Sequence, residues 1–176
     1  SSAASDVYKR QAAHGKRVQA MGGAKNHAII MPDADLDRVV DDLIGAGYGS
    51  AGERCMAISV AVPVGKETAD RLVEKLIPRV ESLKVGLSTD ADADYGPMVT
   101  KEQRDKVAGW IDRGVEQGAD LLVDGRGFEL QGYENGFFIG GSLFDNVTTD
   151  MDLSLIHISE PTRPLYISYA VFCLVK

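Results

Sequence analysis

An arginine and a cysteine stand side by side where the chain has just passed a glycine-rich stretch. The sequence over 48–55 reads Tyr-Gly-Ser-Ala-Gly-Glu-Arg-Cys, and an apolar run over 58–64 follows it. Loops on a rigid scaffold are common places for reactive groups, and glycine allows a ligand to approach the backbone closely. A guanidinium favours the nucleophilic thiolate and can also hold a substrate carboxylate. We therefore predict a nucleophile at Cys55 assisted by Arg54, against the alternatives of an inert buried thiol and a structural ion pair.

Two neighbouring features have simpler interpretations. A carboxylate beside a thiolate would raise the pKa of the thiol, so we expect Glu53 to point elsewhere and to bond the backbone. Residues 47–52 fit the pattern G-x-G-x-x-G by letter. That fingerprint requires a strand before it and a helix after it, whereas here the predicted order is reversed. We therefore expect no dinucleotide loop at this place.

The elements that must position Cys55 alternate between strands and helices. Acidic residues over 33–37 and Thr100 are typical helix starts, and Pro78 interrupts a further amphipathic pattern. The predicted helices begin at 33–37 and end at Gly45 or Gly47, span 67–83, and run from Thr100 to Gly118. The predicted strands are 28–31, 58–64, 119–123, 137–139 and 142–144. This alternation predicts one α/β unit with a mostly parallel sheet and flanking helices.

Composition narrows the classes of partner. The 176-residue chain carries a net charge of -7, which argues against a nucleic-acid partner. No segment reaches the ~20 apolar residues of a membrane helix, so we expect no membrane partner. Two cysteines are too few for a disulfide framework, and the three histidines lack metal-ligand spacing, so we expect no metal. No secretory signal is evident, and we expect a cytoplasmic protein.

The two ends differ in character from the rest. Residues 1–11 show no clear period, and the sequence changes abruptly at 153–176 into an apolar stretch with little charge. Both ends resemble translated sequencing-adapter sequence, and such segments are excluded from fold reasoning. We therefore predict a non-native head over 1–11, a natural part over 12–152 and a non-native tail over 153–176. The alternative is a genuine C-terminal pair of strands.

The natural part resembles the catalytic domain of the aldehyde dehydrogenase superfamily. The Gly-Glu-Arg-Cys sequence over 52–55 matches the active-site motif, and the Met-Gly-Gly of 21–23, the apolar 29–31 and the acidic 33–37 follow the order of an upstream segment. The resemblance implies Cys55 as nucleophile with its backbone amide as oxyanion donor, NAD as cofactor, and cofactor contacts at Met21 and Gly22. It also implies a fragment that lacks the dinucleotide-binding half and has no dehydrogenase activity alone.

One departure from the superfamily pattern separates its branches. Hydrolytic members carry a glutamate before Leu-Gly-Gly as general base for water, whereas this chain has Gln-Ala-Met over 19–21 and no acid over 14–31. The chain thus resembles the methylmalonate-semialdehyde dehydrogenase branch of valine catabolism, which implies coenzyme A as co-substrate, Arg54 as binder of the substrate carboxylate, and a homo-oligomeric parent. A hydrolytic member with another base and a non-catalytic domain of the same fold are the alternatives.

Overall fold

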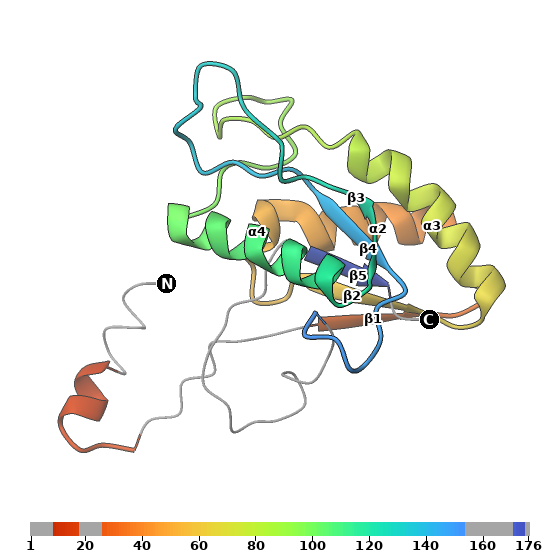
Figure 1. Cartoon of the computed structure of the whole chain (residues 1–176), viewed down its shortest axis with the longest axis horizontal. Coiled ribbons are helices and arrows are strands. Elements are labelled where there is room, and N and C mark those ends of the chain that lie inside the picture. The colour runs from red at the N-terminus through yellow and green to blue at the C-terminus, as the bar shows by residue number, and fades with distance from the viewer. Residues whose placement is uncertain (1–8, 18–25, 154–170, 175–176) are drawn as a thin grey trace.

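A five-stranded sheet forms the centre of the computed structural model, which describes residues 9–17, 26–153 and 171–174 (Figure 1). The strand order is β1-β2-β5-β4-β3. β1 pairs parallel with β2, β5 pairs parallel with both β2 and β4, and only β3 and β4 are antiparallel. The strands are β1 (Asn26–Ile30), β2 (Ile58–Pro63), β3 (Asp120–Val123), β4 (Ser142–Asp145) and β5 (Val171–Leu174). The predicted mostly parallel α/β sheet is confirmed.

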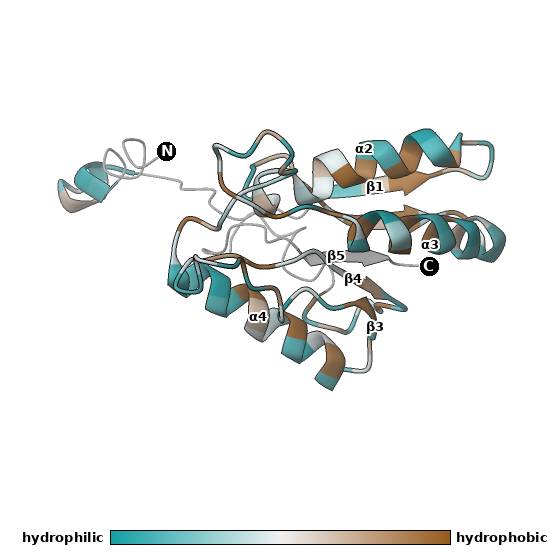
Figure 2. Cartoon of the chain, turned by 90° about the horizontal axis from the view of Figure 1, so that it is seen from above, coloured by the Kyte–Doolittle hydropathy of each residue, from teal (hydrophilic) through white to brown (hydrophobic). Residues whose placement is uncertain are grey.

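Three helices cover the two faces of this sheet. α2 (Leu36–Tyr48) and α3 (Lys66–Glu81) lie side by side on one face, and α4 (Lys101–Glu116) lies on the other (Figures 1 and 2). Figure 2 shows that each helix carries its hydrophobic residues mainly toward the sheet. This amphipathic pattern drives the layered packing, because burial of apolar area is the main favourable term in folding. Within the described part of the chain, no helix is long and apolar enough to cross a membrane.

The helix starts follow from side-chain capping. The carboxylate of Asp35 accepts hydrogen bonds from the amides of Asp37 at 3.1 Å and Arg38 at 3.4 Å, and the Thr100 hydroxyl accepts one from Gln103 at 3.2 Å. Such caps satisfy amides that have no partner inside the helix. The predicted helix starts at 33–37 and at Thr100 are therefore confirmed.

Two boundaries differ from the sequence prediction. α2 does not end at its glycines but continues to Tyr48, which is buried and donates a hydrogen bond to the Ser142 carbonyl at 2.9 Å. The predicted strand over 137–139 is wrong. Its carbonyls are used outside any ladder, since Phe137 accepts from the Met98 amide at 2.9 Å and Ile139 from the Tyr95 hydroxyl at 3.0 Å. Those bonds fix an extended segment that no neighbouring strand pairs.

β5 belongs to the segment that we predicted to be non-native. It occupies the place between β2 and β4, pairing Val60 with Cys173 and Phe144 again with Cys173. A strand ladder uses main-chain groups, so many sequences that can extend are able to fill such a place. The division of the chain into a head over 1–11, a natural part over 12–152 and a tail over 153–176 stays a prediction.

Candidate active site

The predicted nucleophile lies at the tip of a tight turn between α2 and β2. The Ala57 amide donates to the Arg54 carbonyl at 3.0 Å, which closes a β-turn over 54–57. Cys55 and Met56 occupy the two central positions of this turn, and both are exposed. Cys55 is a free thiol. The exposed position contradicts the alternative of a buried inert cysteine and leaves the thiol open to a small electrophile.

The approach to this turn has an unusual backbone. Ser50 and Ala51 adopt φ values of 55° and 53°, and Gly52 follows at 71°. For residues with a side chain, this left-handed conformation costs energy and persists only where the surroundings impose it. Here Ala51 is buried, and the Glu53 amide donates to the Ser50 carbonyl at 2.9 Å. Packing and this bond together hold the bend that turns the chain out of α2.

Arg54 turns back toward the helix that precedes it. Its Nε donates to the Gly49 carbonyl at 3.2 Å, and one terminal nitrogen donates to the Gly45 carbonyl. The carbonyls at a helix C-terminus lack partners and carry partial negative charge, so a guanidinium is well placed there. Arg54 therefore ties the turn to the end of α2, and its side chain remains exposed. Two of its nitrogens have backbone partners, which leaves Nη1 for a further contact.

Glu53 points away from the thiol, as predicted. Its Oε2 accepts a hydrogen bond from the Val99 amide at 3.1 Å, which links the nucleophile turn to the segment before α4. Partial burial raises the pKa of the Glu53 carboxyl above its usual value, and the bond from Val99 opposes that rise. Glu53 is thus a structural link between two loops.

Asn26 is a site residue that sequence reasoning missed. It is the first residue of β1, and its Nδ2 donates to the Cys55 carbonyl at 3.1 Å and to the Ala57 carbonyl at 2.9 Å. The strand was predicted to start only at residue 28, so Asn26 was read as part of a glycine-broken piece. A polar amide immediately before an apolar strand was the available signal, since such side chains often satisfy nearby main-chain groups.

The predicted cofactor contacts fall outside the described residues. Met21 and Gly22 lie in 18–25, so their roles stay predictions. The pattern over 47–52 is no dinucleotide cradle, because it follows α2 and precedes β2. A side chain at Gly49 would also meet the Arg54 guanidinium, so that glycine accommodates an arginine of the chain itself. Among the described residues there is no group of His, Cys, Asp or Glu that could hold a metal ion.

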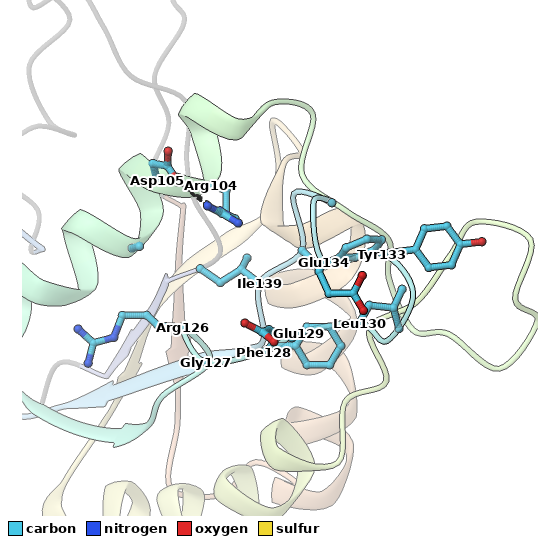
Figure 3. Close-up of a pocket in the computed structure, with 13 residues that line it drawn as sticks. Arg104, Asp105, Arg126, Gly127, Phe128, Glu129, Leu130, Tyr133, Glu134 and Ile139 are labelled. Atoms are coloured by element: carbon cyan, nitrogen blue, oxygen red, sulfur yellow. Dashed lines mark hydrogen bonds and ion pairs between the residues drawn. The ribbon is translucent and has the colours of Figure 1, made fainter.

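A separate pocket of about 220 Å³ lies between α4 and the loop over 125–139 (Figure 3). None of the residues that line it belongs to the nucleophile turn. Its two arginines already have carboxylate partners, because Arg104 bonds Asp105 at 2.8 Å and Arg126 bonds Asp124 at 2.8 Å. Paired charges of this kind stabilise the loop and leave little net attraction for a ligand. The nucleophile turn is therefore the stronger candidate site.

Comparison with known proteins agrees with the turn and the fold. The sequence model of the Aldehyde dehydrogenase family matches residues 1–158. This chain belongs to the aldehyde dehydrogenase family. Among curated family members, it is 59% identical to a malonate-semialdehyde dehydrogenase of Pseudomonas aeruginosa over 170 residues, which are 97% of this chain and 32% of that protein.

Other relatives in the family carry related names. The mitochondrial acylating methylmalonate-semialdehyde/malonate-semialdehyde dehydrogenase of Bos taurus is 42% identical over 82% of this chain and 27% of its own length. A crystal structure of a Sinorhizobium meliloti protein with the name methylmalonate-semialdehyde dehydrogenase, complexed with NAD, matches at 60% identity and a TM-score of 0.82. It covers 96% of this chain and 33% of that one. The chain thus spans about a third of the length of these relatives.

Proposed function

We propose that this chain is the nucleophile-bearing part of an NAD-dependent, CoA-acylating malonate- or methylmalonate-semialdehyde dehydrogenase. The observation that carries the proposal is an exposed cysteine at the tip of a β-turn in an aldehyde dehydrogenase chain. The names of its semialdehyde dehydrogenase relatives and the absence of an acidic residue over 14–31 support the acylating branch. A cytoplasmic location and a homo-oligomeric parent are part of the same proposal.

Cys55 performs the covalent chemistry in this proposal. Its thiolate adds to the aldehyde carbon, and the carbonyl oxygen becomes an oxyanion within reach of the Cys55 amide. Bound NAD⁺ supplies the hydride acceptor, so that the same carbon becomes a thioester carbonyl. Formation of a covalent intermediate divides a difficult oxidation into easier steps. The thioester of a β-oxo acid then loses its carboxyl group as CO₂, and a proton replaces it on carbon.

Release from the enzyme requires a second nucleophile. The thiol of coenzyme A attacks the thioester carbonyl, and the Cys55 thiolate leaves as propionyl-CoA or acetyl-CoA departs. No carboxylate over 14–31 is available as a base for water, which favours the thiol as acceptor. Arg54 is proposed to bind the carboxylate of the semialdehyde through Nη1, because Nε and Nη2 hold the end of α2. Met21 and Gly22 are proposed to contact the cofactor.

The test uses the full-length enzyme that contains residues 12–152. NADH formation from malonate semialdehyde or its methyl derivative is followed with and without coenzyme A, and the products are identified by mass spectrometry. The proposal predicts CoA-dependent turnover with an acyl-CoA product, and none in a Cys55→Ala variant. Turnover that ignores coenzyme A and yields a free acid would instead identify a hydrolytic enzyme.

A further inference from the structure

We propose that Asn26 is a positioning residue for the nucleophile, an inference that rests on the proposed function. Its carboxamide nitrogen contacts the carbonyl oxygens of Cys55 and Ala57 at 3.1 Å and 2.9 Å. An asparagine Nδ2 carries two protons, so each carbonyl can receive its own hydrogen bond. Because both partners are acceptors, only the nitrogen of the carboxamide fits at this place. One side chain thereby grips the turn immediately after the thiol and again two residues later.

These bonds fix the peptide units around the cysteine. The Asn26 amide holds the unit between Cys55 and Met56, and the Ala57 amide holds the unit between Arg54 and Cys55 through the Arg54 carbonyl. Peptide units are planar, so fixing both neighbours of one Cα fixes its φ and ψ. The direction of the Cys55 Cα–Cβ bond, and hence the approach of Sγ to a substrate, is then determined.

The same geometry orients the candidate oxyanion donor. In a trans peptide unit the carbonyl and the N–H point in opposite directions. The Arg54 carbonyl points into the turn toward the Ala57 amide, so the Cys55 N–H points out of the turn. Among the described residues, no acceptor contacts this N–H. Asn26 thus stabilises a turn that presents the thiol and its amide together, and donors fixed in advance stabilise a developing oxyanion best.

Asn26 is itself held by the sheet. It is half-buried, and its backbone pairs with Ile58 at the first position of the β1–β2 register. The register shifts between Asn26 and His27, which marks a local irregularity directly beside the turn. A side chain on a strand is located more accurately than one on a loop. Asn26 therefore transfers the rigidity of the sheet to a turn that is otherwise exposed.

The catalytic test compares Asn26→Ala, Asn26→Asp and Asn26→Gln in the full-length enzyme. The first turnover of NADH is measured by stopped flow, with its rate separated from its amplitude. We expect Asn26→Ala to lower the rate about 10-fold or more, because misplaced reacting atoms lose rate steeply, with little change in KM for NAD. Asn26→Asp is equal in shape but cannot donate, so it should be at least as slow. Asn26→Gln retains the amide and should recover part of the rate.

A matched control removes a carboxamide elsewhere. Gln117 donates to the Asp152 carboxylate at 2.9 Å and accepts from the Asp152 amide at 2.7 Å, at the end of α4. Gln117→Ala should leave the rate of the first turnover unchanged. If Asn26→Ala instead lowers only the amplitude, in proportion to the folded fraction, the role of Asn26 is structural and the proposal is overturned.

A second measurement does not depend on catalysis. Hydrogen exchange of the Ala57 amide in the 176-residue chain reports whether the turn is closed. We expect its protection to fall about 10-fold in Asn26→Ala and in Asn26→Asp, while protection within α3 stays constant. Unchanged protection would overturn the proposal. If the wild-type enzyme shows no more first turnover than Cys55→Ala, the proposed function fails, and the exchange result still decides whether Asn26 holds the turn.

Discussion

The nucleophile turn after α2 and the contact between Gly125 and Gly140 both depend on main-chain hydrogen bonds, but they are held by different partners. Side chains grip the turn from outside, as Asn26 and Arg54 do. The glycine contact is made by backbone against backbone, since the Gly140 amide donates to the Gly125 carbonyl at 2.9 Å. The first arrangement leaves a thiol exposed, whereas the second leaves no space for an added atom. Substitutions should therefore affect mainly the chemistry of the turn and mainly the stability of the glycine contact.

Removal of the thiol should have the largest effect on the chemistry. We expect Cys55→Ala to lower NADH formation by the full-length enzyme at least ~10⁴-fold, because the covalent route loses its nucleophile. The free energy of unfolding should change by less than about 0.5 kcal/mol, because the side chain is exposed. Steady-state kinetics and urea unfolding test the two statements. A large loss of stability would show that the turn is also part of the core.

The 176-residue chain sharpens this expectation. It spans about a third of the length of its relatives. We expect it to form no more NADH than its own Cys55→Ala variant, since the geometry of hydride transfer requires a bound dinucleotide. Formation of NADH by this chain above that control would refute the expectation.

The glycine contact should respond in the opposite way. A Cβ at Gly125 would meet the backbone of Gly140, at 2.7 Å from its Cα, and a backbone cannot move as a side chain can. We expect Gly125→Ala to lower the free energy of unfolding by about 3 kcal/mol or more. Gly109→Ala in α4 is the matched control, because nothing lies within 4 Å of its added Cβ. It should stabilise the helix by about 0.5–1 kcal/mol. Equal effects of the two substitutions in urea unfolding would contradict this explanation.

Arg54 belongs to both the helix end and the proposed substrate site. We expect Arg54→Gln to raise the KM for a semialdehyde with a carboxylate by about 10–100-fold, since a charge-assisted bond contributes about 1.5–3 kcal/mol. The KM for propanal, which has no carboxylate, should stay within a factor of two. Kinetics on the two aldehydes separate the roles, because a purely helix-capping Arg54 would affect both alike.

Gly49→Ala displaces the same guanidinium without removing it. Gly49 has a φ of -53°, which alanine adopts freely, so the only cost is the contact of the new Cβ with Arg54. This variant should lower stability by about 1 kcal/mol through loss of the bonds to the end of α2, while keeping a guanidinium for the substrate. A KM shift as large as that of Arg54→Gln would show that the docked position of Arg54 is required for binding.

The sequence was sufficient for the parts of the molecule that depend on pattern. Amphipathic periodicity and capping residues predicted α3 and α4, and the apolar run after Cys55 predicted β2. The exposed thiol and the backbone bond of Glu53 also agree with prediction. These features depend on neighbours within a few residues, where local chemistry is decisive.

The parts that were missed depend on contacts between distant residues. The extended segment over 137–139 reads as a strand, but the Tyr95 hydroxyl and the Met98 amide take its carbonyls instead. Asn26 is 29 residues from Cys55, and no local pattern connects them. Arg54 was expected beside the thiol or a carboxylate, whereas two of its nitrogens bind carbonyls that only the fold brings near. Tertiary contacts of this kind override local preference.

The smallest effect expected is a pH dependence at the edge of the turn. Burial raises the pKa of Glu53, so the folded chain binds this proton more tightly than the unfolded chain does. The contribution of Glu53 to stability is then greatest below its ordinary pKa and declines as the pH rises through the raised one. Glu53→Gln keeps an acceptor for the Val99 amide and removes this decline. The stability of Glu53→Gln relative to wild type should therefore increase between pH 4 and pH 7.

An exposed glutamate provides the control of opposite sign. Hydrogen bonds from its own amide and from Thr100 at the start of α4 lower the pKa of Glu102. Its contribution is present above the ordinary pKa of glutamate and is lost as the pH falls through the lowered one. The stability of Glu102→Gln relative to wild type should thus decrease over the same interval. Urea unfolding at several pH values measures both variants. If the two curves changed in the same direction, burial of Glu53 could not be the cause, and its bond to Val99 would have to lie on the surface.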